Sequence, residues 1–155
     1  TCALPISPGG KIVYGGGGIM PDVFVPLDTA GISSFYSDVN GKGLIVQFAY
    51  DYLDLHRKEI SERYPDFASY KKDFTIGEEG YKKFLEYAIK NGVKRDEEGV
   101  KYSSSIIRTQ LKALIARQIW KNEGFYPVIH ELDATLKKAE ELMKSSQVAE
   151  ASSNQ

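Results

Sequence analysis

The chain has 155 residues, and its 20 Lys and Arg nearly balance its 21 Asp and Glu, giving a formal net charge of −1. This near neutrality argues against nucleic acid as a partner, because nucleic-acid sites carry a basic excess. The length suits one domain with a core of its own. No apolar run approaches the roughly 20 residues that a membrane-spanning helix needs.

The first residues, 1–7, contain no initiator methionine, no basic stretch and no long apolar run, so we expect no signal peptide in them. We therefore expect a piece of a longer protein, and whether residues 1–7 belong to that parent stays open. Cys2 has no second cysteine to pair with and no histidine nearby in sequence. It predicts neither a disulfide nor a catalytic thiol.

Four consecutive glycines, residues 15–18, dominate the N-terminal part. Glycine loses the most backbone entropy on ordering, so such a run implies positive φ angles or a close approach by another group. Residues 11–14 alternate as a short strand does, and residues 23–25 are β-branched and aromatic. The pattern predicts a tight turn between two short strands, which would need a larger sheet or helices to pack on.

The run KIVYGGGGIMPDVFVPLDT, residues 11–29, resembles the end of the peptidase core in the carboxyl-terminal processing peptidases, also called tail-specific serine proteases. It is most similar to their Bacteroidetes-like branch. That family closes its catalytic domain with a Gly-Ile-x-Pro-Asp segment, matched here by Gly18, Ile19, Pro21 and Asp22. Residues 35–143 resemble, more loosely, the helical tail appended to such proteins.

The resemblance implies a bacterial parent enzyme that cleaves proteins near their carboxyl ends, in the cell envelope or periplasm. An upstream PDZ domain would grip the substrate, and a Ser-Lys dyad would act by nucleophilic catalysis. In the family the dyad precedes the Gly-Ile-x-Pro-Asp segment, so it would lie before residue 1. We therefore expect no catalytic residue, metal or cofactor in this chain itself. Its partners would be the upstream core and PDZ domain, with protein or peptide substrates bound by the parent, and self-association stays open.

The period of the apolar residues changes from 2 to 3.6 near residue 30. We expect residues 1–30 to end a peptidase core, 31–144 to form a helical C-terminal domain, and 145–155 to be a disordered tail of small polar residues. The predicted fold class is mainly α, a compact bundle of about four to five helices preceded by a short β-hairpin or strand pair.

Residues 26–42 are rich in turn formers and predict a linker with one helical turn at 34–39, and the charged residues 93–101 predict a solvated loop. Caps and breakers, including Pro65, Asp66, Gly92, Gly124 and Pro127, delimit five longer helices. We expect these helices at residues 42–64, 67–74, 78–91, 104–122 and 127 to about 143.

The expected core faces consist of apolar residues at three- and four-residue steps. They comprise Leu44, Ile45, Phe48, Ala49, Tyr52, Leu55 and Ile60 in the first long helix, Tyr81, Phe84, Leu85 and Ala88 in the third, Ile107, Leu111, Leu114, Ile115, Ala116 and Ile119 in the fourth, and Ile129, Leu132, Leu136, Ala139, Leu142 and Met143 in the last.

Patterns for phosphate-binding loops fail in the glycine run. A Walker loop needs a hydroxyl residue after its lysine, but Ile12 follows Lys11, and a dinucleotide loop needs a third glycine where Met20 stands. Ser69 and Lys72 have Ser-x-x-Lys spacing, yet their charged neighbourhood would keep the lysine protonated and unfit as a base.

The two histidines, His56 and His130, stand alone, and neither belongs to a His-Glu-x-x-His zinc helix. Aromatic residues at helical spacing fit a core, although a face for peptide binding stays open for them. They are Tyr50, Tyr52, Tyr81, Tyr87, Trp120, Phe125 and Tyr126.

Two other functions remain as alternatives. The chain could be a stand-alone helical protein-interaction module whose glycine-rich start is a flexible lead-in. A nucleotide-binding enzyme is the third hypothesis, and the failed loop patterns weaken it.

Overall fold

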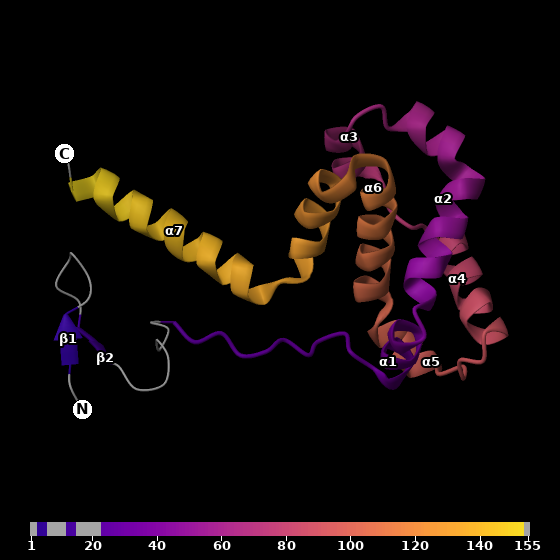
Figure 1. The fold of residues 1–155 in the computed structure, drawn as a ribbon, viewed down its shortest axis with the longest axis horizontal. Coiled ribbons are helices and arrows are strands. Elements are labelled where there is room, and N and C mark those ends of the chain that lie inside the picture. The colour runs from indigo at the N-terminus through magenta and orange to yellow at the C-terminus, as the bar shows by residue number, and fades with distance from the viewer. Residues whose placement is uncertain (1–2, 6–11, 15–22, 154–155) are drawn as a thin grey trace.

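The computed structural model describes residues 3–5, 12–14 and 23–153, with side chains described from 23 to 145. Seven α-helices and one 3₁₀ helix make up most of this described part (Figure 1). The chain is thus mainly helical, as predicted. The helices are α1 Ser34–Gly41, α2 Leu44–Arg63, α3 Phe67–Asp73, α4 Glu78–Lys90, α5 Glu97–Tyr102, α6 Ser104–Ile129, η1 His130–Leu132 and α7 Ala134–Ser153.

Two three-residue strands, β1 Ala3–Pro5 and β2 Ile12–Tyr14, pair antiparallel ahead of the helices. This differs from the prediction, which expected a β-hairpin or two strands at residues 11–14 and 23–25, on either side of the glycine turn. Residues 23–29 contain a bend and irregular chain, and no strand. A strand needs a neighbour to accept its hydrogen bonds, and within the described residues nothing lies beside this segment as a strand. The predicted turn at 15–18 lies outside the described residues.

The predicted linker is shorter than expected, because residues 34–41 form the complete helix α1 rather than one turn. Ser33 caps this helix by accepting a hydrogen bond from the Tyr36 backbone N–H at 3.1 Å. Phe35 and Val39, four residues apart, share one face and are buried. Within the described residues after the strands, residues 23–32, called the connector below, form an irregular lead-in with a turn at 30–31.

Three predicted helices are confirmed to within two residues. Helix α2 ends just before Pro65, and Asp66 caps α3 by accepting a hydrogen bond from the Ser69 N–H at 2.8 Å. Helix α4 stops where Gly92 adopts a φ of +77°, a left-handed conformation that glycine takes without strain.

The predicted loop at 93–101 is wrong, because residues 97–102 form helix α5. Asp96 is its N-cap and accepts a hydrogen bond from the Gly99 N–H at 3.0 Å. Glu97 and Glu98 occupy the first turn, where negative charge is favourable beside the helix dipole. The charges that suggested a solvated loop are therefore the start of a helix.

Helix α6 is broken, but not by Gly124. Lys121 has φ 56° and ψ −140°, which ends the first segment, and a second segment continues to Ile129. Figure 1 shows the chain turning back after the first segment, so that the second lies beside it. An added Cβ on Gly124 would lie 2.8 Å from the Ala116 carbonyl oxygen. Gly124 is thus a point of close approach between the two segments rather than a helix terminator.

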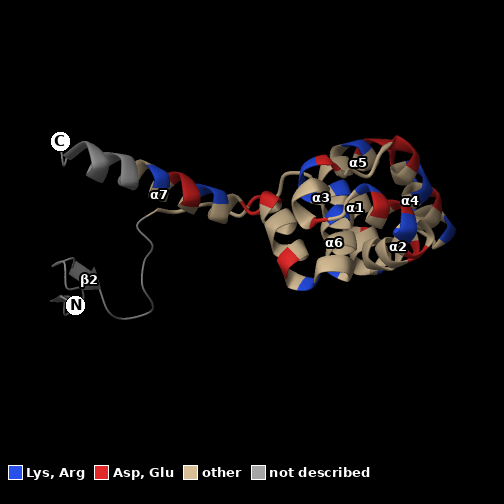
Figure 2. Cartoon of the chain, turned by 90° about the horizontal axis from the view of Figure 1, so that it is seen from above, with Lys and Arg blue, Asp and Glu red and all other residues tan. Residues whose placement is uncertain are grey.

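The predicted last helix, 127–143, is divided between three elements. Pro127 lies inside the second segment of α6, η1 follows, and Asp133 starts α7 by accepting a hydrogen bond from the Leu136 N–H at 2.9 Å. Helix α7 continues to Ser153, so the predicted disordered tail at 145–155 is helical over its described residues. It projects away from the other helices, on the side from which the connector arrives (Figures 1 and 2).

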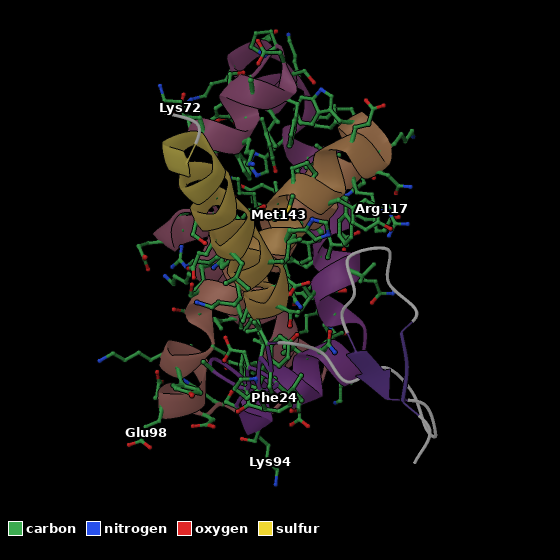
Figure 3. All side chains as sticks on the ribbon, turned by 90° about the vertical axis from the view of Figure 1, so that its left-hand side faces the viewer. Phe24, Lys72, Lys94, Glu98, Arg117 and Met143 are labelled. Carbon is green, nitrogen blue, oxygen red and sulfur yellow. The ribbon has the colours of Figure 1, made fainter. Side chains whose placement is uncertain are left out.

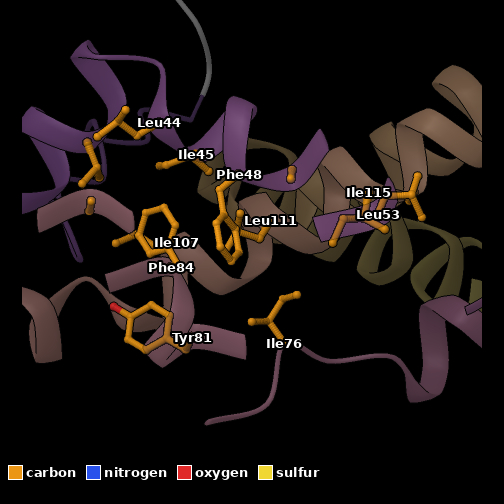
Figure 4. Packing of buried hydrophobic residues seen from close by; sticks show 14 of the residues in the cluster. Leu44, Ile45, Phe48, Leu53, Ile76, Tyr81, Phe84, Ile107, Leu111 and Ile115 are labelled. Atoms are coloured by element: carbon orange, nitrogen blue, oxygen red, sulfur yellow. The ribbon is translucent and has the colours of Figure 1, made fainter. Parts of the chain in front are cut away.

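The hydrophobic core lies where α2, α4 and α6 meet (Figure 4). Helices α1 and α3 lie at its two ends (Figure 1). Most predicted core residues of α2, α4 and α6 are buried or half-buried. Leu55 is a correction: it is 82% exposed, whereas Leu53 is fully buried. Two helical positions differ by about 200°, so these leucines face opposite sides. Leu142 and Met143 of α7 are likewise exposed, because α7 leaves the body formed by α1 to η1, called the helical body below.

Candidate functional site

The Ser-x-x-Lys pair does not form a catalytic unit. The Ser69 hydroxyl donates a hydrogen bond to the Asp66 carbonyl at 2.8 Å, and the Ser69 N–H donates to the Asp66 carboxylate. The hydrogen bond from that N–H is the main cause that lowers the pKa of Asp66. Lys72 is exposed at the edge of the molecule (Figure 3). Ser69 therefore works as part of a helix cap.

The two histidines lie in ordinary partly exposed positions. His56 Nδ1 is 3.3 Å from Glu59 Oε2, and its ring lies 4.5 Å from the Tyr52 ring, both within one turn of α2. The His130 ring is 5.5 Å from that of Tyr126. Within the described residues, no three His, Cys, Asp or Glu side chains gather as a metal site would require.

Most of the aromatic residues belong to the core. Tyr70 is fully buried, its ring stacks on Phe74 at 4.5 Å between centroids, and it lies 5.0 Å from Trp120. Its hydroxyl donates to the Lys112 carbonyl at 2.9 Å, and burial raises its pKa well above the ordinary value. Among the residues considered for a peptide face, only Tyr50 and Tyr126 are about half exposed.

Arg108 of α6 ties the start of α4 to the core. Its guanidinium lies 4.3 Å from the centre of the Tyr81 ring, and it donates to the Ile76 carbonyl and, at 2.7 Å, to the Glu78 carboxylate. Burial raises the pKa of Tyr81 to about 12, although the positive charge of Arg108 acts in the opposite direction. These contacts give Arg108 a structural role, because they hold the residues at the start of α4 against α6.

The connector carries large apolar side chains that the described residues leave uncovered. Phe24 is 80% and Leu27 is 89% exposed. A cleft of about 490 Å³ separates it from α6, η1 and the start of α7. Its apolar wall includes Leu27, Ile106 and Ile129. The sequence analysis did not predict this surface. The available signal was Phe24 and Leu27, two large apolar residues close to Pro26 and outside any segment with helical periodicity.

One residue that lines the same cleft, Gln110, has a buried polar atom. Gln110 donates through Nε2 to the Tyr36 hydroxyl at 2.7 Å, while its Oε1 is buried and has no hydrogen-bond partner within the described part of the chain. Such an acceptor normally costs about 1–3 kcal/mol when unpaired. The connector cleft is therefore lined by apolar side chains and by one residue that has an unpaired buried acceptor.

In the described part of the chain, no helix is both long and apolar enough to span a bilayer. No curated protein and no solved structure gives a significant match to the chain. A family model matches residues 35–121, more than half of the chain and nearly the whole helical body. The chain therefore belongs to that family, described as a family of unknown function (DUF8443).

Proposed function

We propose that this chain is the carboxyl-terminal portion of a tail-specific serine endopeptidase, and that its helical body is a non-catalytic domain appended to the peptidase core. Proteolysis near protein carboxyl ends would be performed by an upstream Ser-Lys dyad, in the cell envelope or periplasm. The helical body would serve packing against the core, assembly of subunits or control of access to the active site.

The observation that carries the proposal is the contrast at the connector. Full burial of one large apolar side chain is worth about 1.5–3 kcal/mol, yet Phe24 and Leu27 are left mostly exposed. They lie in extended chain directly after the Gly-Ile-x-Pro-Asp segment that resembles the end of a peptidase core. We infer that this segment belongs to a sheet of a preceding domain, which would cover these apolar side chains.

The boundaries of the helical body support the same division. Ser33 caps α1 without help from the connector, and the core is made by residues from Phe35 onward. The body can therefore be an independent unit, which an appended domain needs to be.

The test compares the parent protein, expressed with its upstream sequence, with this chain alone. We expect backbone amides of residues 23–29 to be protected from hydrogen exchange only in the parent. Phe24→Ser should reduce that protection in the parent and change nothing in the isolated chain. The matched control is Leu55→Ser, which removes an equally exposed side chain from the helical body.

Activity gives the second arm of the test. The parent should cleave a peptide with a free carboxyl terminus, and the isolated chain should not. A parent without peptidase activity, or equal exchange of residues 23–29 in both proteins, would overturn the proposal.

One observation favours the alternative of a stand-alone interaction module. The family match covers the helical body and excludes the segment that carries the peptidase resemblance. In that case the upstream reading frame would encode no peptidase, and the exposed connector would bind a separate protein instead.

A further inference from the structure

A second cleft, of about 700 Å³, lies between α2 and the break in α6, and three cationic side chains line it. They are Arg57 from α2 and Arg117 and Lys121 from α6. Asp54 is the one carboxylate among the lining residues, which also include Tyr50, Gln118 and Asn122. Elsewhere on the helices acidic and basic residues are interspersed (Figure 2). We call this region the basic cleft.

Both walls of the basic cleft are held in place. Tyr50, Asp54 and Arg57 are spaced four and three residues apart, so they share one face of α2. The Gln118 side chain on α6 donates through Nε2 to the Ala49 carbonyl of α2 at 3.1 Å. This bond joins the two helices at a residue that lines the cleft.

The cationic groups keep much of their capacity to donate hydrogen bonds. The guanidinium of Arg117 lies 5.1 Å from the centre of the Phe125 ring. A cation–π contact of this kind does not use the N–H groups, which lie in the guanidinium plane and can still donate hydrogen bonds. Arg57 makes a single contact of 3.4 Å with Asp54, and both side chains are more than half exposed. Because this contact is long and both groups are exposed, it is weak, and most N–H donors of Arg57 can bind water or a ligand.

The break in α6 brings Lys121 to this cleft. Its φ of 56° lies in the left-handed region, which glycine adopts far more readily than lysine. Unfavourable backbone geometry is concentrated at functional sites in proteins. At this position, whose backbone conformation suits glycine, the chain has a lysine. Its side chain lines the cleft together with Arg57 and Arg117.

We propose that the basic cleft binds an oxyanion, a carboxylate or phosphate group carried by a small ligand or by a peptide end. The two guanidinium groups supply planar paired donors that match such oxygens, and Lys121 adds a point charge. Tyr50 and Asn122 add neutral donors at the rim. This inference stands on the geometry of α2 and α6 and does not depend on the proposed peptidase.

The experiment titrates the full chain with two probes, inorganic phosphate and an N-acetylated peptide with a free carboxyl terminus, and follows the side-chain NMR signal of Arg117. The amidated peptide is the control ligand. A saturable shift with phosphate indicates a phosphoryl ligand, and a shift with the free but not the amidated peptide indicates a carboxylate. Either result supports the oxyanion site.

Three substitutions test the location. Lys121→Gln should weaken binding about tenfold, as expected for loss of a charge-assisted hydrogen bond. Lys94→Gln makes the same charge change at an exposed site far from Arg117 (Figure 3) and should leave affinity within about twofold, because distant surface charges are screened by salt. Asp54→Asn removes the one carboxylate that lines the cleft and should tighten binding.

Lys121→Gly guards against misfolding as the cause of lost binding, because glycine fits the backbone at this position. It should lose affinity as Lys121→Gln does while the thermal unfolding temperature stays the same or rises. The proposal is overturned if neither probe gives a saturable shift. It is also overturned if Lys94→Gln weakens binding as much as Lys121→Gln.

Discussion

The helical body and the connector differ in how far their apolar side chains are buried. In the body, large side chains on the inner helix faces are buried, such as Leu53, Phe84 and Leu111. In the connector, Phe24 and Leu27 remain mostly exposed. The stability of the chain should therefore reside in the body, while the connector has side chains whose burial requires another surface. The following predictions test and sharpen that division.

The largest effect is expected for Leu53→Ala in α2. Leu53 is fully buried, so truncation should lower the free energy of unfolding by about 2–5 kcal/mol, the sum of lost burial and a residual cavity. Leu55→Ala, on the same helix but 82% exposed, should change it by less than about 0.5 kcal/mol. Urea denaturation measures both. Equal losses would mean that α2 is rotated relative to the structure.

Gly124→Ala tests the close contact between the two segments of α6. The new Cβ would lie 2.8 Å from the Ala116 carbonyl oxygen and 2.9 Å from Trp120 Cβ, so the segments must separate, at a cost of about 1–3 kcal/mol. Gly41→Ala is the control, because no atom lies within 4 Å of its added Cβ, and we expect it to be neutral or slightly stabilising. A neutral Gly124→Ala would contradict the packing of the second segment.

Alkaline pH should weaken the helical body through its buried tyrosines. Burial raises the pKa of Tyr81 from the ordinary 10.0 to about 12. Its contribution is present in full below pH 10 and is lost between pH 10 and 12, because the unfolded chain releases its proton first. Tyr70, whose pKa is raised further, acts in the same direction.

The measurement for the tyrosines is the unfolding temperature across pH 9 to 12, with Tyr81→Phe as the variant. We expect Tyr81→Phe to be less stable near neutral pH, since the hydroxyl donates to the Val100 carbonyl at 3.0 Å. The variant should also lose less stability on going to pH 12. If the unfolding temperature fell with pH equally in the variant and the wild type, Tyr81 would have the same pKa in the folded and unfolded states.

The helices of the body were predictable where local signals and tertiary packing agree. Pro65, Asp66 and Gly92 mark helix ends by their own backbone chemistry, and the structure places those ends within two residues. Helix α5 was missed although Asp96 and the two glutamates after it form an N-terminal signal, because its charges suited a loop equally well.

The break in α6 and the basic cleft could not be predicted in the same way. Lys121 is a good helix former, and its left-handed backbone results from the second segment packing back on the first. The cations Arg57 and Arg117 are 60 residues apart in sequence and meet only because α2 packs on α6. The sequence shows these cations only as single charged residues on amphipathic helices, and it does not indicate that they line one cleft.

Lys121→Gly should raise stability, in contrast to the usual effect of glycine in a helical protein. Relief of the left-handed strain should exceed the entropy that glycine adds to the unfolded chain, for a net gain of about 1 kcal/mol. Lys58→Gly, an exposed site within α2, is the matched control and should cost about 1 kcal/mol. The same sign in both variants, measured by thermal unfolding, would argue against the break at Lys121.

The smallest effect is expected for deletion of residues 1–30. The core begins at Phe35, and Ser33, which caps α1, is retained in the shortened chain. The free energy of unfolding of the helical body should therefore change by less than about 0.5 kcal/mol. A loss above about 1 kcal/mol would show that the connector packs against Ile106 strongly enough to belong to the body. The exposed Phe24 and Leu27 would then no longer argue for a preceding domain, because their segment would already have its partner in α6.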